Sequence, residues 1–502
     1  MKIYLFGHDY KYAVEQMLLT VFPEERPEYP GGDPEGDRME VSLRRNGSIT
    51  EAACLLINGD NRWEGRDSAL FAEDAGDLLS NRTEQRLVKN AIYRAALRSG
   101  VPRPVWGALT GVRPGKVLSR ILDEEQNSRD ALERFKKEYD VSPERAALCM
   151  DTAAYTMRTR AELKEKDVCL YVGIPFCPTR CSYCSFVSQS VEKSRDLIAP
   201  FTEALKKEIR ATARAAASAG LRPVSVYFGG GTPTTLTPEQ LDGLFSEMEQ
   251  RFDLSSVREF TVEAGRPETI NPEKLAVMRE HGVTRISVNP QTMSDSVLNV
   301  IGRKHTAGDI LSAVDMVRAA GAFQINMDLI AGLPSDTPEN FERSLRTVSG
   351  LEPENITVHT LSLKKGSRIT LEETEIPAGE EVGRMLAFSS KYLRENGYEP
   401  YYLYRQKFMS GGFENTGWTK KGFANLYNVC IMEELCSIIA MGGGGSTKLI
   451  RPGDGRNIRV MNPKYPKEYI ETIDKICADR TKIIEFFSKE NDYGISAERP
   501  EL

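Results

Sequence analysis

The sequence has 502 residues, of which 40% are apolar and 27% charged, a composition typical of a globular protein with two or three domains. Its formal net charge of −6 shows no basic surplus of the kind that indicates nucleic-acid binding. The sequence contains no run of about 18 uncharged apolar residues, and His8, Asp9 and Lys11 interrupt the apolar start, so we expect no membrane span, no export signal and a cytoplasmic location.

Residues 1–166 are predicted to form an α+β accessory domain. A short strand opens it, and two strand-like runs flank the hairpin turn signal around Asn46-Gly47. An amphipathic helix follows and is closed by Gly100, with apolar side chains at helical spacing at Leu87, Val88, Ala91, Ile92 and Ala95. Helices are expected to fill the rest of the region.

Residues 167–365 alternate between strands and helices. The strand-like runs are 168–174, 224–230, 259–264, 284–289, 325–332 and 356–362. The amphipathic helices between them are 195–218, 238–250, 271–281, 307–319 and 338–349. This alternation predicts a parallel sheet with right-handed crossovers, in which functional groups gather at the carboxyl ends of the strands.

Residues 366–502 are less regular, and we expect a mixed C-terminal domain that covers the substrate. A helix is predicted near 379–395. It precedes an aromatic-rich segment, 397–408, and a glycine run, 442–445, that follows an apolar strand-like stretch.

Three cysteines stand directly after the first strand of the second region. Cys177, Cys181 and Cys184 have the spacing C-x3-C-x2-C. Four thiolates would saturate a [4Fe–4S] cluster, so three leave one iron with an open position. A zinc site would require a fourth Cys or His nearby, and neither residue type follows Cys184 until His281. A disulfide suits neither an odd number of cysteines nor the cytosol. The motif therefore predicts a catalytic iron–sulfur site.

The other six cysteines receive no functional role from the sequence. Cys169 is interpreted as a small core residue of its strand, and five are interpreted as free thiols: Cys54, Cys149, Cys430, Cys436 and Cys477. The C-x5-C spacing of Cys430 and Cys436 is poor for a second complete cluster.

With an aromatic residue, Tyr183, before its third cysteine, the motif resembles that of the radical S-adenosylmethionine (SAM) superfamily. The resemblance implies that SAM chelates the free iron through its amino and carboxylate groups. One electron from the cluster then cleaves SAM to a 5′-deoxyadenosyl radical, which abstracts hydrogen from the substrate. A low-potential electron donor, such as flavodoxin or ferredoxin, is the implied partner.

Further motifs narrow the resemblance to the oxygen-independent coproporphyrinogen III oxidase family. They are Phe228-Gly229-Gly230-Gly231-Thr232-Pro233-Thr234, Glu263, Ser287-x3-Gln291, Gly302-Arg303-x-His305 and Asp328-Leu329-Ile330-x-Gly332-Leu333-Pro334. Residues 1–166 resemble only the long clostridial and bacillar branch. The resemblance implies a partial (β/α)6 TIM-like barrel between the accessory and C-terminal domains.

The resemblance also assigns roles by position. Tyr171 and Glu263 would contact the SAM on the cluster, Glu263 through the ribose hydroxyls. Tyr183 would pack beside the cluster, and Ser362 would lie near the same SAM. Six positions match those that bind a second SAM in the coproporphyrinogen enzyme: Gly230, Gly231, Thr232, Gln291, Arg303 and Asp328.

The sequence departs from the family pattern at several positions, including Gly173, where the family has histidine, and Phe186, where a fourth cysteine stands in the decarboxylases. The implied reaction is the oxidative decarboxylation of coproporphyrinogen III to protoporphyrinogen IX in anaerobic haem biosynthesis. Cations would anchor the substrate carboxylates. The candidates are Arg303, Lys364, Lys365, Arg368 and Arg405.

Two alternatives remain open, because relatives without the fourth cysteine include haem-trafficking proteins and haem-degrading methyltransferases. A haem chaperone on this fold could use His359, Tyr401, Tyr402 or Tyr404 as an axial ligand. A methyltransferase would instead open haem to a methylated linear tetrapyrrole. The bound tetrapyrrole would be haem in both cases.

Overall fold

The computed structural model describes residues 1–70, 77–125, 127–184, 189–321, 323–364, 366–372, 374–406, 409–451 and 457–488. Two positions named above, Phe186 and Lys365, lie outside this set. The chain divides into two units, Met1–Met150 and Asp151–Leu502. The predicted three-part division at residues 166 and 365 stays a prediction.

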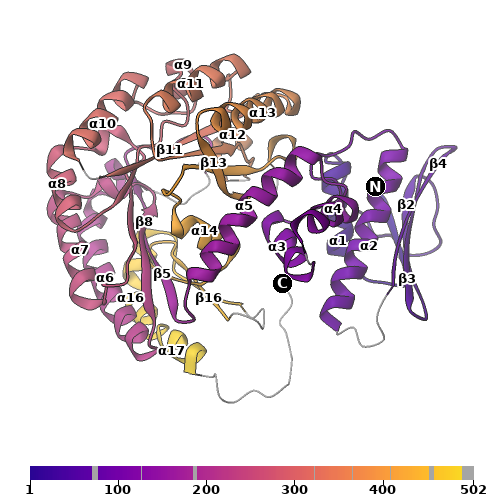
Figure 1. The fold of residues 1–502 in the computed structure, drawn as a ribbon, viewed down its shortest axis with the longest axis horizontal. Helices are drawn as coiled ribbons and strands as arrows, with labels where there is room; N and C mark the ends of the chain where they lie inside the picture. The colour runs from indigo at the N-terminus through magenta and orange to yellow at the C-terminus, as the bar shows by residue number, and fades with distance from the viewer. Residues whose placement is uncertain are drawn as a thin grey trace. The chain divides into compact units, whose positions relative to one another are not determined.

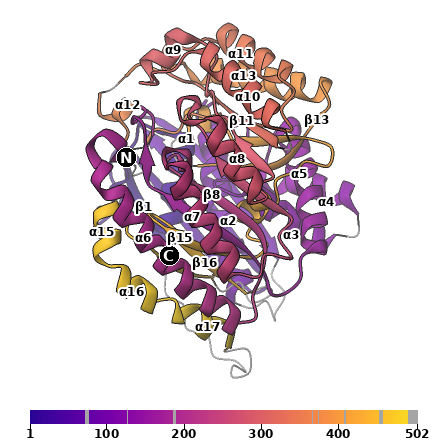
Figure 2. The ribbon, with the colours of Figure 1, turned by 90° about the vertical axis from the view of Figure 1, so that its left-hand side faces the viewer.

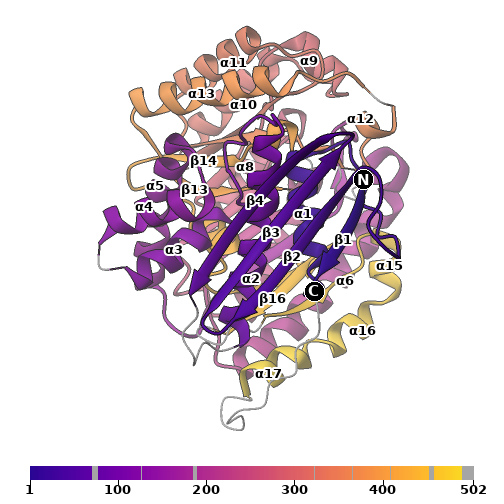
Figure 3. The ribbon, with the colours of Figure 1, turned by 90° about the vertical axis from the view of Figure 1, so that its right-hand side faces the viewer.

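The first unit is built on a four-stranded sheet in the order β1-β2-β3-β4, whose strands are β1 (Lys2–Phe6), β2 (Arg38–Asn46), β3 (Ile49–Asn58) and β4 (Asn61–Leu70) (Figure 3). β1 is parallel to β2, and the other pairs are antiparallel. The expected hairpin is confirmed: Asn46 pairs with Ile49, and Gly47 adopts a φ of 59°, a backbone conformation that glycine reaches without steric cost.

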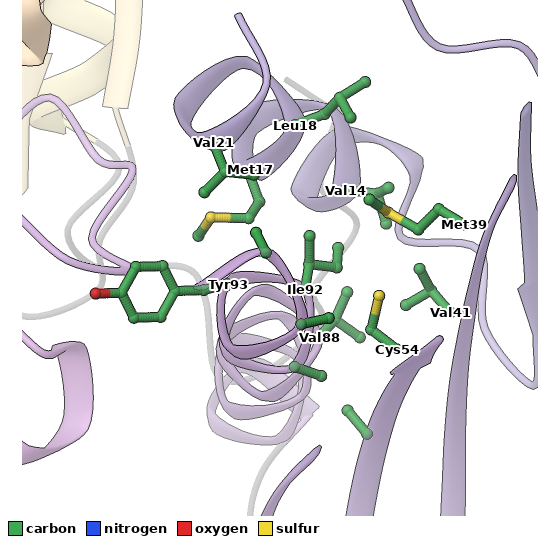
Figure 4. Packing of buried hydrophobic residues seen from close by; sticks show 14 of the residues in the cluster. Val14, Met17, Leu18, Val21, Met39, Val41, Cys54, Val88, Ile92 and Tyr93 are labelled. Atoms are coloured by element: carbon green, nitrogen blue, oxygen red, sulfur yellow. The ribbon is translucent and has the colours of Figure 1, made fainter. Parts of the chain in front are cut away.

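Two helices, α1 (Lys11–Val21) and α2 (Asp77–Arg98), cover one face of this sheet. Figure 4 shows Met17 of α1 and Ile92 of α2 packed with Val41 of β2 and Cys54 of β3. Each fully buried aliphatic side chain of this kind contributes about 1.5–3 kcal/mol of transfer free energy. The helix predicted from residues 87–95 is therefore confirmed as the central element of this core. The helices that follow are α3 (Pro114–Glu124), α4 (Ser128–Tyr139) and α5 (Pro143–Glu162).

The second unit contains an eleven-stranded sheet in the order β13-β14-β12-β11-β10-β9-β8-β5-β15-β16-β17. Its parallel part is β5 (Asp167–Ile174), β8 (Arg222–Gly230), β9 (Glu259–Glu263), β10 (Arg285–Ser287), β11 (Gln324–Ala331), β12 (Asn355–Thr360) and β15 (Ser437–Gly442). The first six are the strands predicted from sequence. Within the described residues the two outer strands do not pair, so the barrel is partial, as expected.

The predicted crossover helices are confirmed as α6 (Val191–Ser218), α7 (Pro238–Arg251), α8 (Pro272–Glu280), α10 (Ala307–Ala320) and α11 (Pro338–Gly350), and they form a layer outside the parallel strands (Figures 1 and 2). Capping side chains begin several of them; Thr237 and Gln240, for example, form a capping box at α7. Unlike these five, α9 (Asp295–Val300) was not predicted.

Strands from residues 366–502 extend the same sheet on both sides. β14 (Asn415–Lys420) and β13 (Tyr398–Tyr404) follow β12 on one side, and β15, β16 (Ser446–Ile450) and β17 (Asn457–Met461) follow β5 on the other. Three short helices, α15 (Pro466–Glu471), α16 (Ile473–Ala478) and α17 (Thr481–Ser488), lie along α6 (Figure 2). The helix predicted near 379–395 is α13 (Gly379–Glu395).

The seventh parallel strand explains why glycine replaces the family histidine at position 173. Gly173 accepts a hydrogen bond of 3.0 Å from the backbone N–H of Gly443. A Cβ on Gly173 would lie 2.6 Å from the Gly443 carbonyl oxygen, which is closer than real Cβ atoms approach. The glycine run after β15 therefore occupies the space that a histidine side chain would need.

A search of the described helices finds none with the length and apolar character to cross a membrane.

Candidate active site

Most of the predicted site residues lie in the carboxyl-terminal halves of successive parallel strands or directly after them. Tyr171 is on β5, Gly230 ends β8 and is followed by Gly231 and Thr232, and Glu263 ends β9. Gln291 follows β10, Asp328 is on β11, and Ser362 follows β12. Because these strands are neighbours in the sheet, the positions lie together toward the carboxyl-terminal end of the parallel strands, where α/β folds bind ligands.

The glycine turn after β8 holds the cysteine loop. The backbone N–H of Gly231 donates to Ile174 at 2.8 Å, and that of Thr232 donates to Phe176 at 2.7 Å. A Cβ on Gly231 would lie 2.4 Å from the Phe176 oxygen, so this approach requires glycine. These two amides are therefore not free to meet a ligand carboxylate, because both bind the chain next to Cys177.

Two buried arginines surround the same loop. Arg266 donates to the carbonyl and hydroxyl oxygens of Thr179 at 2.7 and 2.8 Å. Arg303 donates to the Asn289 carbonyl at 2.6 Å and to the Tyr183 hydroxyl at 3.3 Å. Burial by itself would raise the pKa of the Cys181 thiol, but these two guanidinium groups outweigh it, and the pKa is lowered. The loop is therefore suited to negatively charged thiolates.

The motif sulfurs do not form a triangle as compact as the ligands of one metal ion. Among the described residues, the only three Cys, His, Asp or Glu side chains with ligand atoms all within 4.8 Å of one another are Cys169, Cys430 and Cys436. The motif cysteines are therefore spread more widely than the ligands of one zinc ion, which lie about 3.8 Å apart for Zn–S bonds of about 2.3 Å. Thiolates on three different irons of a cuboidal cluster need this wider spacing, so the motif residues fit a [4Fe–4S] cluster.

Glu263 lies in a half-buried pair of carboxylate and phenol. The Tyr227 hydroxyl donates to Glu263 at 2.6 Å, and the Tyr227 ring stacks on Tyr171 with centroids 6.2 Å apart. Burial raises the pKa of Glu263 to about 7, because it outweighs the hydrogen bond from Tyr227. A ligand that donates hydrogen bonds here would favour the ionised carboxylate.

A second polar group forms between β10, β11 and β12. Asp328 accepts from Asn326 at 2.9 Å and lies 3.6 Å from the Nε2 atom of His359. Its pKa is lowered, because the neighbouring His359 and Asn326 outweigh burial. Gln291 adopts a φ of 67°, and its buried Oε1 atom has no hydrogen-bond partner. A strained residue with an unsatisfied polar atom is a feature of ligand sites.

The other residues predicted to anchor substrate carboxylates differ in burial and in pKa. Lys364 is half-buried, and burial lowers its pKa, whereas Arg368 is exposed. Arg405 is half-buried and donates to the Gly412 carbonyl at 3.1 Å, and burial lowers the pKa of its guanidinium to about 10. A β-bridge between Ser362 and Met409 joins the segments that carry Lys364 and Arg405.

The candidate axial haem ligands differ in how far their side chains are exposed. Tyr401 and Tyr402 are core residues, with 0% and 4% exposure, and their hydroxyls contact Asn428 and Thr357. His359 retains 27% side-chain exposure beside Asp328. Tyr404, the fourth candidate, is half-buried like His359, so these two residues are the partly exposed candidates.

Comparison with known proteins identifies the family. The model of the radical SAM superfamily matches residues 171–348. A Bacillus subtilis protein, "Oxygen-independent coproporphyrinogen-III oxidase-like protein HemZ", is 38% identical over 94% of this chain and 95% of its own length. The chain is a radical SAM protein of the oxygen-independent coproporphyrinogen III oxidase family. Its cofactors are accordingly a [4Fe–4S] cluster and SAM.

Other members of the radical SAM superfamily match shorter stretches. A "Heme chaperone HemW" of Haemophilus influenzae is 27% identical over 60% of this chain and 75% of its own length. The solved structure of Escherichia coli coproporphyrinogen III oxidase (HemN) has 23% sequence identity and a TM-score of 0.49, and the match covers 64% of this chain and 72% of that one.

Two residues that carry no role in the sequence-based prediction contact this candidate site: Arg266 bonds the cysteine loop and Tyr227 bonds Glu263. Their positions in the sequence could have indicated a place near the site. Tyr227 lies in the strand before the glycine turn, and Arg266 follows Glu263 by three residues, just after a predicted strand. Their roles require the neighbouring strands to be aligned, because Tyr227 meets Glu263 across β8 and β9 and Arg266 meets the cysteine loop after β5.

Proposed function

We propose that this protein catalyses the oxidative decarboxylation of coproporphyrinogen III to protoporphyrinogen IX, in which two propionates become vinyl groups. The observation that carries the proposal is the continuous 38% identity over 94% of the chain with the coproporphyrinogen-III oxidase-like protein of Bacillus subtilis. The Haemophilus haem chaperone aligns over only 60% of the chain.

In this proposal the chain's own residues bind and orient. Cys177, Cys181 and Cys184 would hold the cluster, and Glu263 would accept the ribose hydroxyls of SAM. Bound together, the two cofactors supply a reductive cleavage of SAM and abstraction of a propionate β-hydrogen. Loss of CO2 from the substrate radical would release one electron, which balances the electron consumed in cleaving SAM, and would complete each vinyl group.

The polar residues beyond β10, β11 and β12 support a second ligand at the same edge of the sheet. We propose that Gln291, Arg303 and Asp328, with the glycine turn, face this second ligand. Lys364 and Arg405 would anchor substrate propionates, since an incoming carboxylate would offset the burial of both cations. A low-potential flavodoxin or ferredoxin is the proposed electron donor.

The test is an anaerobic incubation of reconstituted protein with dithionite, SAM and coproporphyrinogen III. We expect CO2, 5′-deoxyadenosine and protoporphyrinogen by mass spectrometry. Cys181→Ala should abolish all three products, whereas Cys477→Ala, a thiol outside the motif, should not. Formation of 5′-deoxyadenosine without CO2 or protoporphyrinogen would reject decarboxylation and leave the radical chemistry standing.

A haem-binding function is the second candidate, favoured by the partly exposed His359 and by the relatives named haem chaperones. In a parallel incubation with haem, this candidate predicts a stoichiometric Soret shift that His359→Ala removes, with coproporphyrinogen left unchanged. A methylated linear tetrapyrrole would instead indicate haem opening.

A further inference from the structure

Three cysteines outside the motif meet in the second unit. Cys169 comes from β5, Cys430 from α14 (Leu426–Glu433), and Cys436 from the segment before β15. Their sulfur atoms all lie within 4.8 Å of one another, and those of Cys169 and Cys436 are 3.7 Å apart. The fold thus brings cysteines that are more than 250 positions apart in the sequence into one cluster of three thiols.

This group lies at the opposite end of the strands from the radical SAM site. Cys169 is near the start of β5, whereas Cys177 follows its end. Cys436 directly precedes β15, which runs parallel to β5 and pairs Ile438 with Cys169. The amino ends of parallel strands are the side that contributes to stability rather than to chemistry.

The sulfur triangle has the size that a single metal ion needs. With sides of at most 4.8 Å, its centre lies within about 2.8 Å of each sulfur, and a small inward shift gives the Zn–S distance of about 2.3 Å. Copper(I) and zinc are the ions that thiolate ligands select. A disulfide would use two of the three sulfurs and leave the third without a role.

The surroundings exclude hard cations. The thiols are 0%, 0% and 6% exposed, and they pack among Val224, Tyr427 and Ile438. Two acids act electrostatically on these thiols, Asp167 and Glu259, and both are held in ion pairs, by Arg222 at 2.5 Å and by Arg285 at 2.8 Å. No carboxylate or imidazole joins the three sulfurs within 4.8 Å among the described residues. An ion here would be coordinated by sulfur alone.

We propose that Cys169, Cys430 and Cys436 form a binding site for one copper(I) ion, separate from the iron–sulfur cluster. Three thiolates satisfy copper(I), whereas a structural zinc ion needs a fourth ligand. The ion links α14 and β15 to β5. Its role is structural, because it fixes the seventh parallel strand on the sheet beneath Tyr171, which stacks on Tyr427 of α14 with centroids 6.1 Å apart.

The test uses the full chain with Cys177, Cys181 and Cys184 changed to alanine, so that the cluster thiols cannot bind the added ion. Cu⁺ and Zn²⁺ are titrated separately and anaerobically against a chromophoric chelator. We expect one equivalent of Cu⁺ to bind, more tightly than Zn²⁺, with an increase in melting temperature. Since outer-shell partners alone are worth 10–100-fold in metal affinity, Cys430→Ser should weaken binding about 100-fold or more.

The matched control is Cys54→Ser, which changes another thiol of 0% exposure, in the first unit, and should leave the affinity unchanged. X-ray absorption of the copper-loaded chain should show sulfur neighbours only and does not depend on the folding of any Cys430 variant. Failure to bind Cu⁺, oxygen or nitrogen as the majority neighbours, or a Cys169–Cys436 disulfide in anaerobically isolated protein would overturn the proposal.

Discussion

Arg303 is the residue that ties the cysteine loop to the rest of the sheet. Its guanidinium is 7% exposed and bonds two backbone carbonyls as well as the Tyr183 hydroxyl. A buried positive charge next to a cluster of thiolates stabilises the reduced, more negative cluster. Arg303 thus contributes both to the geometry of the loop and to its charge.

Replacing this charge should change the cluster without removing a ligand. Arg303→Met is expected to lower bound iron and to make the reduction potential of the remaining cluster more negative. A potentiometric titration followed by electron paramagnetic resonance measures the shift. Arg258→Met, which removes a half-exposed ion pair with Glu162, serves as the control and should leave the potential unchanged.

Glu263 should make stability and SAM binding depend on pH in opposite ways. Because its pKa rises from 4.5 to about 7 on folding, the folded state holds the extra proton, and its stabilising effect is lost as pH rises from about 4.5 through 7. The loss is on the order of 3 kcal/mol for a shift of this size. In the proposed function the SAM hydroxyls would donate to the ionised form, so SAM affinity should increase over the same range.

The comparison variant is Glu263→Gln, which cannot ionise. Its free energy of unfolding should decline less than that of the wild type between pH 5 and pH 8, and its SAM affinity should be independent of pH in that window. Chemical denaturation and calorimetric titration measure the two quantities. Equal pH profiles in both proteins would contradict the raised pKa.

At the scale of elements, the turn after β8 organises the site. Its two amides hold β5 and the cysteine loop in place, and the carbonyl contacts are too short for any residue with a Cβ at position 231. The conformation of one strand end therefore decides whether the three thiols of the neighbouring loop are positioned correctly.

Gly231→Ala should separate the turn from the loop. We expect a loss of most of the reconstituted cluster, measured by iron content and visible absorption, together with a destabilisation of about 1–3 kcal/mol from overpacking. The control is Gly308→Ala, because a Cβ at this position in α10 meets only the Thr306 hydroxyl at 3.6 Å. That variant should keep its iron.

At the scale of the whole molecule, a buried ion pair connects the C-terminal helices to the second unit's sheet. Glu208 of α6 is 0% exposed and pairs with Arg480, which precedes α17. Glu208 also accepts from the backbone N–H of Gly442 at 2.8 Å. The same carboxylate thus links α6, the glycine run after β15 and the C-terminal helices.

Removing Arg480 should leave the negative charge of Glu208 buried without its partner. Arg480→Met is expected to cost about 3–5 kcal/mol of unfolding free energy. Adding Glu208→Gln to that variant should recover part of the loss, because no unpaired charge remains. Arg210→Met, which breaks a half-exposed ion pair of α6 with Glu247, should cost no more than about 1 kcal/mol. Urea denaturation distinguishes these outcomes.

The sequence by itself determined the alternation of six strands and five helices, the cysteine loop after the first strand, and the edge of the sheet that carries the site. These features depend on local periodicity and on the spacing of neighbouring residues, which a linear pattern records. The family motifs at successive strand ends could be located for the same reason.

Only the tertiary structure decided how distant segments meet. It placed β15 beside β5 and thereby explained Gly173, it used the glycine-turn amides to hold the cysteine loop, and it joined Cys169 to Cys430 and Cys436. The physical reason is that each arrangement depends on strand order and register between segments far apart in the chain, and no local pattern encodes which strand will become the neighbour of another.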